Sequence, residues 1–270
     1  MSGDSMQDSA FTSTTATVFQ DIGSGPAVVL LHGFPFNHSL WQEQAMVLSQ
    51  RYRVIVPDLP GFGGSSLGES PVTMNQMAQE VVELMDLLEV NDATIGGLSM
   101  GGYVVLAFYK LFPDRVRALV LADTRAQGDT EEAKQVRAKQ AEEALSEGMI
   151  GIVNSMLPKL FTPDSVTKRP EAVKRIREMM MTTKPEGAAG ALMGMAIRED
   201  QTETLSRINV PTLILVGRDD VITPVVDSES MHAKIPRSQL VVIENAGHVS
   251  NVEQADVFNS KLLSFLDEIN

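Results

Sequence analysis

The sequence predicts an α/β protein, in which a mostly parallel central sheet is covered by helices on both faces. Two observations lead to this prediction. Short runs rich in β-branched residues recur along the chain, each followed by a helix-length amphipathic segment. Each run is also so continuously apolar that both faces of the strand are expected to be buried between layers of helices. Alternation of such strands and helices is typical of the α/β class.

The expected elements follow in chain order. An edge strand near Thr14 to Gln20 begins the sheet and ends at the Gly-Ser-Gly-Pro turn, residues 23–26. The other strands are expected at 27–32, 52–58, 93–99, 116–123, 212–217 and 239–244. Helices are expected at 39–50, 73–90, 100–112, 225–235 and 252–267.

One long interval interrupts this order. From about Thr124 to Ile208 the sequence shows helical patterns divided by prolines and no convincing strand. A connection of this length without structure of its own would be unusual. We therefore predict a helical cap inserted at 124–208, after the sixth strand, and a core formed by 12–123 and 209–270. Residues 1–11 are polar and are expected to form a flexible tail.

Composition restricts the classes of function. Hydrophobic residues make up 43% of the 270 and charged residues 21%, which is ordinary for a folded globular protein. The net charge of −13 repels nucleic acid and anionic lipid, so we expect neither as a partner. The chain has no cysteine, which excludes disulfides, a cysteine nucleophile and thiolate zinc sites.

Short sequence motifs bear on targeting and on cofactors. The first residues lack the basic start and apolar stretch of a signal peptide. The apolar runs are far shorter than the roughly 20 residues of a membrane span. A cytoplasmic location is therefore expected, unless a leader has been removed. The G-x-G segments at 23–25 and 61–63 do not join a strand to a helix, and no phosphate loop or H-E-x-x-H motif occurs. We expect no cofactor and no metal.

The segment Ile95 to Tyr103 reads IGGLSMGGY and lies where an apolar run gives way to a helical pattern. Glycine is unfavourable in the interior of either element, so four glycines around one serine indicate a geometric requirement. Gly97-Leu98-Ser99-Met100-Gly101 matches G-x-S-x-G, in which a tight strand-to-helix turn exposes a strained serine. Ser99 is therefore the candidate nucleophile, and the alternative is a glycine-rich turn without chemistry.

A serine nucleophile requires a base, and the base requires a carboxylate that holds its tautomer. Both partners are expected to follow the serine in the chain, which leaves His232 and His248 among four histidines. His248 follows a strand at its carboxyl end, where open α/β proteins place their chemistry, so it is the predicted base. His232 is expected to be a solvated helix residue. Asp219 and Asp220 both follow the preceding strand, and the residues alone leave the choice of acid open.

The arrangement resembles the α/β-hydrolase superfamily over about residues 12–268. The pattern that is usual in this family after the acid-bearing strand is G-x-x-D-x-x-x-P. Gly217 and Pro224 then assign the acid to Asp220 and leave Asp219 as a surface turn residue. A less favoured position for the acid, after an earlier strand, is Asp123. Besides the elbow, the segments that carry the resemblance are HGFP at 32–35, DLPGFGGS at 58–65 and NAGH at 245–248.

The resemblance implies an α/β-hydrolase fold and an oxyanion hole formed by the backbone N–H groups of Phe34 and Met100. Met100 opens a helix, whose first N–H groups lack internal partners and carry the positive end of the dipole, so physical reasoning supports it as well. His32 is then expected to orient its loop. His38 lies in a polar turn and is expected to be exposed and without a partner.

Two residues are candidates for the substrate pocket. Trp41, the only tryptophan, follows the oxyanion loop and would line the acyl pocket or serve packing alone. Arg125 follows the strand that ends at Asp123 and would bind a substrate carboxylate, although a surface salt bridge is the favoured alternative. The inserted helices are expected to close over Ser99 and to determine specificity.

The expected function is that of a carboxylesterase-like serine hydrolase, which cleaves a small ester or lactone through an acyl-enzyme. Serine at the elbow, where dehalogenases and epoxide hydrolases carry aspartate, argues against those two activities. The alternatives are an activity similar to that of 3-oxoadipate enol-lactonase, cofactor-free perhydrolysis, and a non-catalytic receptor that keeps the pocket. The expected partner is a small-molecule substrate, and the protein is expected to be a monomer or a small homo-oligomer.

Overall fold

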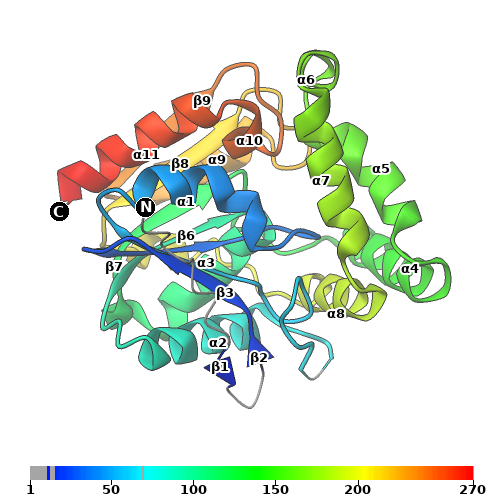
Figure 1. The fold of residues 1–270 in the computed structure, drawn as a ribbon, viewed down its shortest axis with the longest axis horizontal. Helices are drawn as coiled ribbons and strands as arrows, with labels where there is room; N and C mark the ends of the chain where they lie inside the picture. The colour runs from blue at the N-terminus through cyan, green and yellow to red at the C-terminus, as the bar shows by residue number, and fades with distance from the viewer. Residues whose placement is uncertain (1–10, 13–15, 69, 270) are drawn as a thin grey trace, which may run out of the picture.

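The structure, a computed structural model, describes residues 11–12, 16–68 and 70–269 (Figure 1). A twisted central sheet has helices on both faces, and a group of further helices lies at one side of it. The predicted mostly parallel sheet covered by helices is confirmed. The predicted tail at 1–11 lies outside the described residues, apart from Phe11.

The large sheet has seven strands in the order β3-β5-β4-β6-β7-β8-β9. β3 (Phe19–Ile22) is antiparallel to β5 (Arg53–Pro57), whereas the other neighbouring pairs are parallel. The five remaining strands are β4 (Ala27–Leu31), β6 (Ala93–Leu98), β7 (Val116–Ala122), β8 (Thr212–Gly217) and β9 (Ser238–Ile243). A separate pair is formed by β1 (Phe11–Thr12) and β2 (Ala16–Thr17).

The edge strand differs from its prediction at 14–20. β3 runs from Phe19 to Ile22, and residues 13–15 lie outside the described residues. Backbone pairing with β5 continues to Ile22, and the Arg53 guanidinium supports it by donating to the Asp21 carboxylate at 2.7 Å. The strand therefore extends to the turn at Gly23, whose φ of 79° suits glycine.

Helices cover the two faces of the sheet. α1 (Gln42–Leu48) and α11 (Ala255–Ile269) pack together on one face, and α2 (Met74–Leu87) and α3 (Met100–Leu111) pack together on the other (Figure 1). α9 (Val225–Lys234) packs on β8 and β9. Three short 3-10 turns are η1 (His38–Trp41), η2 (Pro113–Arg115) and η3 (Thr204–Arg207).

The last predicted helix, 252–267, is divided in two. A short turn, α10 (Ser250–Glu253), precedes α11, and the chain changes direction at Gln254, which has φ −129° and ψ 52°. All four residues of α10 are buried, and polar contacts outside the helix hold the side chains of Ser250, Asn251 and Glu253. These contacts fix the direction of α10 independently of α11.

The inserted helices, as we call α4–α8, follow β7 at the predicted position in the chain. β7 is the fifth strand of the large sheet in chain order, so the prediction that the insertion follows the sixth strand is wrong by one strand. Prolines begin α6, α7 and α8, where the missing N–H costs nothing. The five helices are α4 (Glu131–Glu147), α5 (Ile150–Leu160), α6 (Pro163–Lys168), α7 (Pro170–Thr182) and α8 (Pro185–Ala196).

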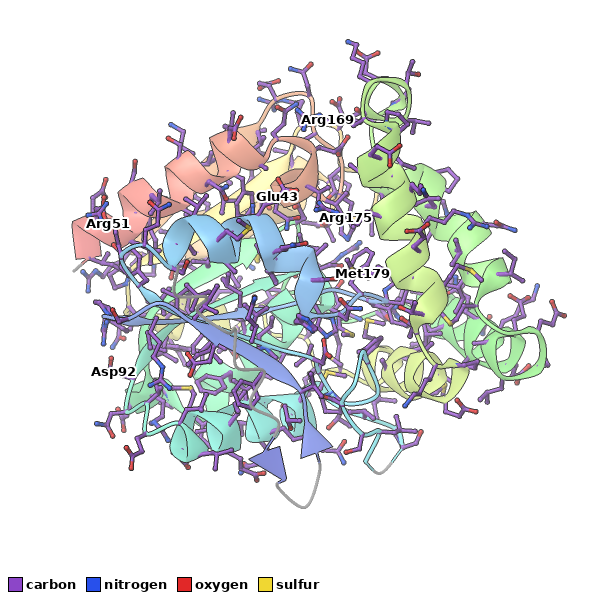
Figure 2. The ribbon with its side chains drawn as sticks, viewed as in Figure 1. Glu43, Arg51, Asp92, Arg169, Arg175 and Met179 are labelled. Carbon is purple, nitrogen blue, oxygen red and sulfur yellow. The ribbon has the colours of Figure 1, made fainter. Side chains whose placement is uncertain are left out.

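Polar contacts join the inserted helices to the rest of the fold. In Figure 2, Arg175 of α7 points toward Glu43 of α1, and their side chains form an ion pair of 2.7 Å. The Thr183 hydroxyl, just past α7, donates to the carbonyl of Pro35 at 2.8 Å. Among the residues that the structure describes, none of the helices has the length and apolar character that crossing a membrane requires.

Candidate active site

The turn that carries Ser99 has the strained geometry that the glycine pattern predicts. Ser99 lies between β6 and α3 with φ 56° and ψ −115°, a backbone conformation that residues other than glycine rarely adopt. A Cβ atom on Gly97 would lie 2.3 Å from the backbone of Gly101, and one on Gly101 would lie 2.3 Å from the carbonyl oxygen of Leu31. The glycines are therefore required by close backbone approach, and the turn projects the serine from the end of β6.

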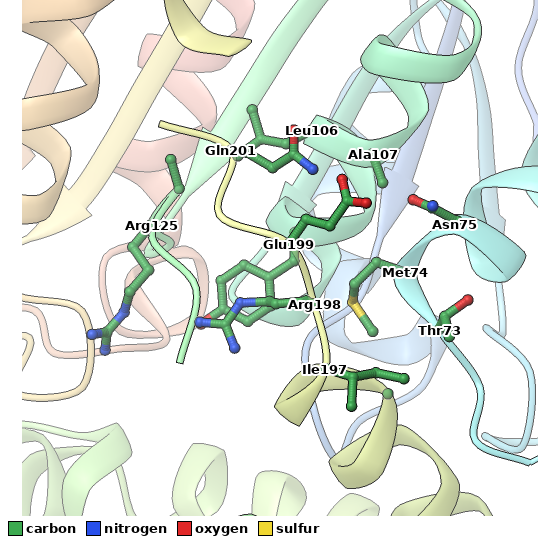
Figure 3. A pocket seen from close by; sticks show the side chains of 13 residues that line it. Thr73, Met74, Asn75, Leu106, Ala107, Arg125, Ile197, Arg198, Glu199 and Gln201 are labelled. Atoms are coloured by element: carbon green, nitrogen blue, oxygen red, sulfur yellow. The ribbon is translucent and has the colours of Figure 1, made fainter. Parts of the chain in front are cut away.

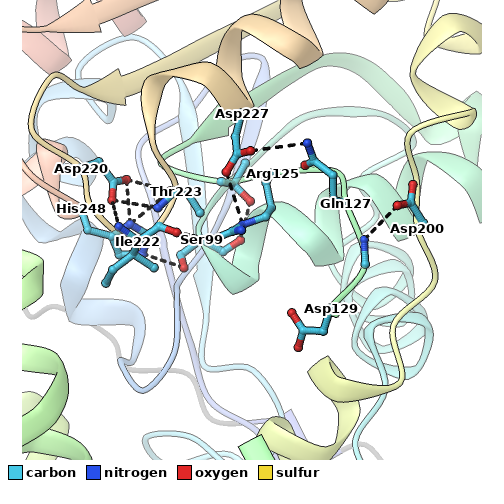
Figure 4. Close-up of polar contacts among 12 residues, drawn as sticks. Ser99, Arg125, Gln127, Asp129, Asp200, Asp220, Ile222, Thr223, Asp227 and His248 are labelled. Atoms are coloured by element: carbon cyan, nitrogen blue, oxygen red, sulfur yellow. Dashed lines mark hydrogen bonds and ion pairs between the residues drawn. The ribbon is translucent and has the colours of Figure 1, made fainter. Parts of the chain in front are cut away.

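Three side chains from distant parts of the chain meet at this turn (Figure 4). The Ser99 Oγ lies 2.8 Å from Nε2 of His248, and Nδ1 of His248 lies 2.8 Å from Oδ2 of Asp220. The histidine is 1% exposed and the aspartate 4%. With Nδ1–H donating to Asp220, Nε2 is left to accept the serine proton. The structure thus brings together the three residues that the sequence predicts as nucleophile, base and acid.

The environment of Asp220 favours its charged form. Oδ1 accepts from the backbone N–H groups of Ile222 at 2.8 Å and Thr223 at 3.0 Å, and Oδ2 accepts from the Thr223 hydroxyl at 2.7 Å. Burial opposes ionisation, but His248 and these donors together hold the pKa of the Asp220 carboxyl below its usual value. Burial likewise opposes the charged imidazole, yet the charge of Asp220 raises the pKa of His248 overall.

The competing candidates for the acid and the base make other contacts. The Asp219 side chain is exposed, and His232 is exposed on α9, where Nδ1 contacts the Ser238 hydroxyl at 2.8 Å. Asp123 is fully buried, and its carboxylate accepts from the Gly217 N–H at 2.8 Å and the Ser250 hydroxyl at 2.6 Å. These bonds connect the end of β8 to the start of α10, so the contacts of Asp123 are structural.

The pKa of Asp123 is strongly perturbed. Burial, and then the charge of Asp220, raise the pKa of the Asp123 carboxyl to about 8. A second carboxylate close to an already ionised one resists losing its proton. Asp123 therefore adds a titratable group beside the three meeting side chains.

The segment after β4 runs beside the serine. A Cβ atom on Gly33 would lie 3.3 Å from Cβ of Ser99, so the backbone leading to Phe34 passes close to the reactive oxygen. Met100 is the first residue of α3, where the N–H group has no partner within the helix. Met100 thus follows Ser99 directly in the chain, and Phe34 follows the glycine that lies beside Ser99.

The two histidines near this segment have different roles. His32 is buried, its Nδ1 donates to the Gly33 carbonyl and its Nε2 accepts from the Leu59 N–H, each at 2.9 Å. Burial lowers the pKa of His32 to about 4, so the ring is neutral and orients its loop. The prediction that His38 is exposed without a partner is wrong. Its Nδ1 lies 2.7 Å from a carboxylate oxygen of Asp58, and its side chain is 35% exposed. The sequence offers no sign of this pair, whose members are 20 residues apart.

The two pocket candidates also differ. Trp41 is fully buried, and its ring packs against Phe258 of α11 at 5.9 Å, which favours the packing interpretation. Arg125 donates through Nη2 to the carbonyl of Ile222, and its Nε lies 3.5 Å from the Asp227 carboxylate (Figure 4). Arg125 is thus engaged in a half-buried ion pair.

A small cavity lies between α2, α3 and the segment that follows α8 (Figure 3). Its volume is about 130 Å³, and Arg125 lies at its edge. Tyr103 and Arg198 line it, with the guanidinium stacked 4.2 Å above the ring centre. Arg198 also forms an ion pair of 2.6 Å with Asp129, and both side chains are almost fully buried. These contacts occupy the Arg198 guanidinium.

Sequence reasoning missed three polar residues of the site. Thr223 donates to Asp220 and its hydroxyl lies 3.3 Å from Nδ1 of His248. Glu253 and Ser250 hold the loop that carries His248. Only Thr223 had a sequence signal, since it stands between the acid and Pro224. No group of three or more His, Cys, Asp or Glu side chains in the described part of the chain is arranged to hold a metal ion.

Comparison with known proteins identifies the family. Residues 26–255 match the family model described as the alpha/beta hydrolase fold. The chain belongs to the α/β-hydrolase family. The resemblance predicted from the sequence is confirmed, and so is the fold class.

Curated and solved α/β hydrolases are similar to this chain over most of its length. It is 31% identical to 3-oxoadipate enol-lactonase 2 of Acinetobacter baylyi, covering 91% of this chain and 90% of that protein. A thermophilic esterase from Thermogutta terrifontis, solved with malate bound, is 40% identical with a TM-score of 0.93, covering 94% of both chains. The enol-lactonase from Burkholderia xenovorans LB400 is 29% identical with a TM-score of 0.89, covering 94% of this chain and 97% of that one. The protein is therefore a hydrolase of the α/β fold.

Proposed function

We propose that this hydrolase cleaves small carboxylic esters or lactones through an acyl-enzyme. One observation carries the proposal, which is the 2.8 Å contact of Ser99 Oγ with a His248 imidazole whose other nitrogen contacts Asp220 at 2.8 Å. A serine hydroxyl is a weak nucleophile at neutral pH, and an imidazole held by a carboxylate activates it. The similarity to enol-lactonases and to an esterase supports the same class of reaction.

The proposed reaction has two steps. Ser99 Oγ attacks the carbonyl carbon while His248 Nε2 takes its proton, and the imidazolium returns that proton to the departing alkoxide. Water then attacks the acyl-enzyme with the same histidine as base, which releases the acid and restores the serine. Asp220 stays ionised throughout, because three hydrogen-bond donors from Ile222 and Thr223 and the adjacent imidazolium all stabilise the negative charge.

The oxyanion of each tetrahedral intermediate is assigned to the backbone N–H groups of Phe34 and Met100. Met100 opens α3, so its amide carries the positive end of the helix dipole. Donors of this kind contribute about 10² to 10³ in rate. The close approach of Gly33 to Ser99 supports the assignment of its neighbour Phe34 as the second donor.

The inserted helices are proposed as the cap that shapes the substrate pocket over Ser99. The engagement of Arg125 with Asp227 bears on what this pocket accepts. A guanidinium that already faces a carboxylate supplies little net positive charge for a substrate carboxylate, and the chain as a whole carries −13. Neutral esters are therefore the favoured substrates.

A carboxylate-bearing enol-lactone is the second candidate. The enol-lactonases similar to this chain favour it, and Arg125 would have to leave Asp227 to bind the carboxylate. Perhydrolysis differs from hydrolysis only in that hydrogen peroxide attacks the acyl-enzyme in place of water. A receptor that keeps the pocket would acylate once and stop.

The test measures hydrolysis of 4-nitrophenyl acetate and butyrate, a simple lactone and peracid formation with added peroxide. Sustained turnover of esters is expected, whereas a single burst equal to the enzyme concentration would favour the receptor. Ser99→Ala should abolish both turnover and labelling by a fluorophosphonate probe. Full turnover in Ser99→Ala would refute the mechanism.

A matched pair of histidine variants controls for nonspecific effects. His248→Gln should lose turnover, and His232→Gln should keep it, since His232 is exposed on α9 and its Nδ1 contacts the Ser238 hydroxyl. Far-ultraviolet circular dichroism would verify that each variant is folded.

A further inference from the structure

Glu253 is a buried carboxylate that the proposed reaction does not use. It is the last residue of α10 and is 0% exposed. Burying a carboxylate is costly unless hydrogen bonds compensate it. The groups that donate hydrogen bonds to this carboxylate come from two different parts of the chain, so Glu253 connects them.

One carboxylate oxygen faces the inserted helices. Oε1 accepts from the backbone N–H of Thr162 at 2.8 Å and from its hydroxyl at 3.1 Å. Thr162 lies between α5 and α6 and caps α6 by accepting from the Ser165 N–H. Glu253 therefore reaches the junction of two inserted helices.

The other oxygen faces the loop that carries His248. Oε2 accepts from the backbone N–H of Gly247 at 2.5 Å. The His248 N–H donates to the carbonyl of Leu160 at 2.9 Å, so the main chain joins the same two segments. A Cβ atom on Gly247 would lie 2.8 Å from that carbonyl oxygen, which means that only glycine permits this approach.

We propose that Glu253 is a positioning residue for His248, which fastens the histidine loop to the α5–α6 junction and so sets the imidazole against Ser99. The inference rests on the proposed function for the reaction that it serves. Two residues after His248, the Ser250 hydroxyl donates to Asp123 at 2.6 Å, which attaches this segment to the sheet. The histidine lies between these two attachments, one to the core and one to the inserted helices.

The kinetic consequence follows from distance. A displacement of about 1 Å in a reacting group can cost roughly 10² in rate. Because Leu160 and Glu253 attach the inserted helices directly to the histidine loop, a shift of the α5–α6 junction moves the base. The contact therefore makes the position of the inserted helices a determinant of the chemical step, in addition to any role in shaping the pocket.

Glu253→Gln tests the proposal with almost no change in volume. The amide has one acceptor oxygen, so its NH2 group must face either Gly247 N–H or Thr162 N–H, and one of the two attachments is lost. We expect kcat for 4-nitrophenyl acetate to fall by roughly ten to a hundredfold, with KM within about twofold of the wild type. Glu244→Gln is the matched control, since Glu244 is an exposed residue of the same loop, and it should leave kcat unchanged.

Thr162→Val probes the attachment from the other side and serves if Glu253→Gln does not fold. It removes the hydroxyl donor and keeps the backbone N–H, so a smaller fall in kcat is expected. A merely structural glutamate would lower the melting temperature in either variant and leave kcat of the folded enzyme within twofold of the wild type. That result would overturn the proposal.

A readout that needs no turnover separates this inference from the proposed function. The Nδ1 proton of His248, hydrogen-bonded to Asp220, should give a downfield proton resonance that is absent in His248→Gln. If the wild type hydrolyses none of the esters, the proposed function fails, and this resonance alone decides the positioning role. A shifted or broadened signal in Glu253→Gln supports it, and an unchanged signal overturns it.

Discussion

Replacing Asp220 by asparagine removes the negative charge that faces the imidazole of His248 and keeps the size of the side chain. The amide oxygen would occupy the position of Oδ1, where two backbone N–H groups require an acceptor. The NH2 group would then face Nδ1 of His248 and force that nitrogen to accept. The imidazole proton would move to Nε2, where it faces Ser99 and prevents the histidine from acting as base.

The magnitude follows from the charge and the burial. Asp220 and His248 side chains are 0% and 1% exposed, so water screens their interaction little. Two unit charges about 4 Å apart interact by about 4 kcal/mol at an effective dielectric constant of about 20. Loss of that stabilisation of the imidazolium corresponds to about 10³ in rate. The wrong tautomer increases the loss, so kcat should fall by about 10³ to 10⁴.

The assay is steady-state hydrolysis of 4-nitrophenyl acetate, with folding checked by the melting temperature. Asp219→Asn is the matched control, because it makes the same change at the adjacent, exposed aspartate and should keep wild-type kcat. If Asp220→Asn kept more than a tenth of wild-type kcat, the assignment of Asp220 as the acid would be wrong, and Asp123 would be the next residue to replace.

Three further predictions concern Gly97 in the turn before Ser99, the buried Asp123 and Arg125. Gly97→Ala should unfold the protein or sharply lower its melting temperature, since the new methyl group would lie 2.3 Å from backbone atoms, whereas Gly151→Ala has open space and should be neutral or slightly stabilising. The pKa of Asp123 is raised to about 8, above its unfolded value, so its protonated form is the one that folding favours. Its contribution to the free energy of unfolding is therefore full below about pH 4 and is lost as the pH rises through about 8. In urea titrations at a series of pH values, Asp123→Asn should reduce this dependence of the free energy of unfolding on pH. Arg125 disfavours the imidazolium, so Arg125→Gln should raise the pKa of His248 and move the acid limb of the kcat/KM profile to higher pH, where an unmoved limb would contradict this account.

The sheet and the elbow were predictable because their signals are local. Apolar runs define the strands, and Gly97 and Gly101 beside Ser99 reflect backbone contacts within a few residues or at the end of the neighbouring strand. His248 and Asp220 were identified by their places after strands, and the resemblance then distinguished Asp220 from Asp219. The division between α10 and α11 was not predictable, because polar contacts from outside the helix fix the first turn and leave the apolar pattern continuous across it.

The supporting contacts could not be predicted for a related reason. The His38–Asp58 pair spans 20 residues, the Thr162–Glu253 contact 91 and the Asp123–Ser250 contact 127. Nothing in the local sequence of Glu253 separates it from a solvated glutamate at a helix end. Only the fold shows that this residue is fully buried and that it faces backbone donors.

The two buried acidic residues beside the histidine loop, Asp123 and Glu253, attach it to different parts of the fold. Asp123 attaches α10 to the end of β8, and these contacts do not involve the inserted helices. Glu253 attaches the same turn to the inserted helices, whose other contacts with the remaining fold include the Arg175–Glu43 pair and the Thr183 hydroxyl. Of the two attachments, the one through Glu253 is therefore the one that movement of the inserted helices would release first. A substrate that packs against those helices would then hold the base in position as it binds, so kcat should fall as the acyl group is shortened, by a larger factor in Glu253→Gln than in the wild type.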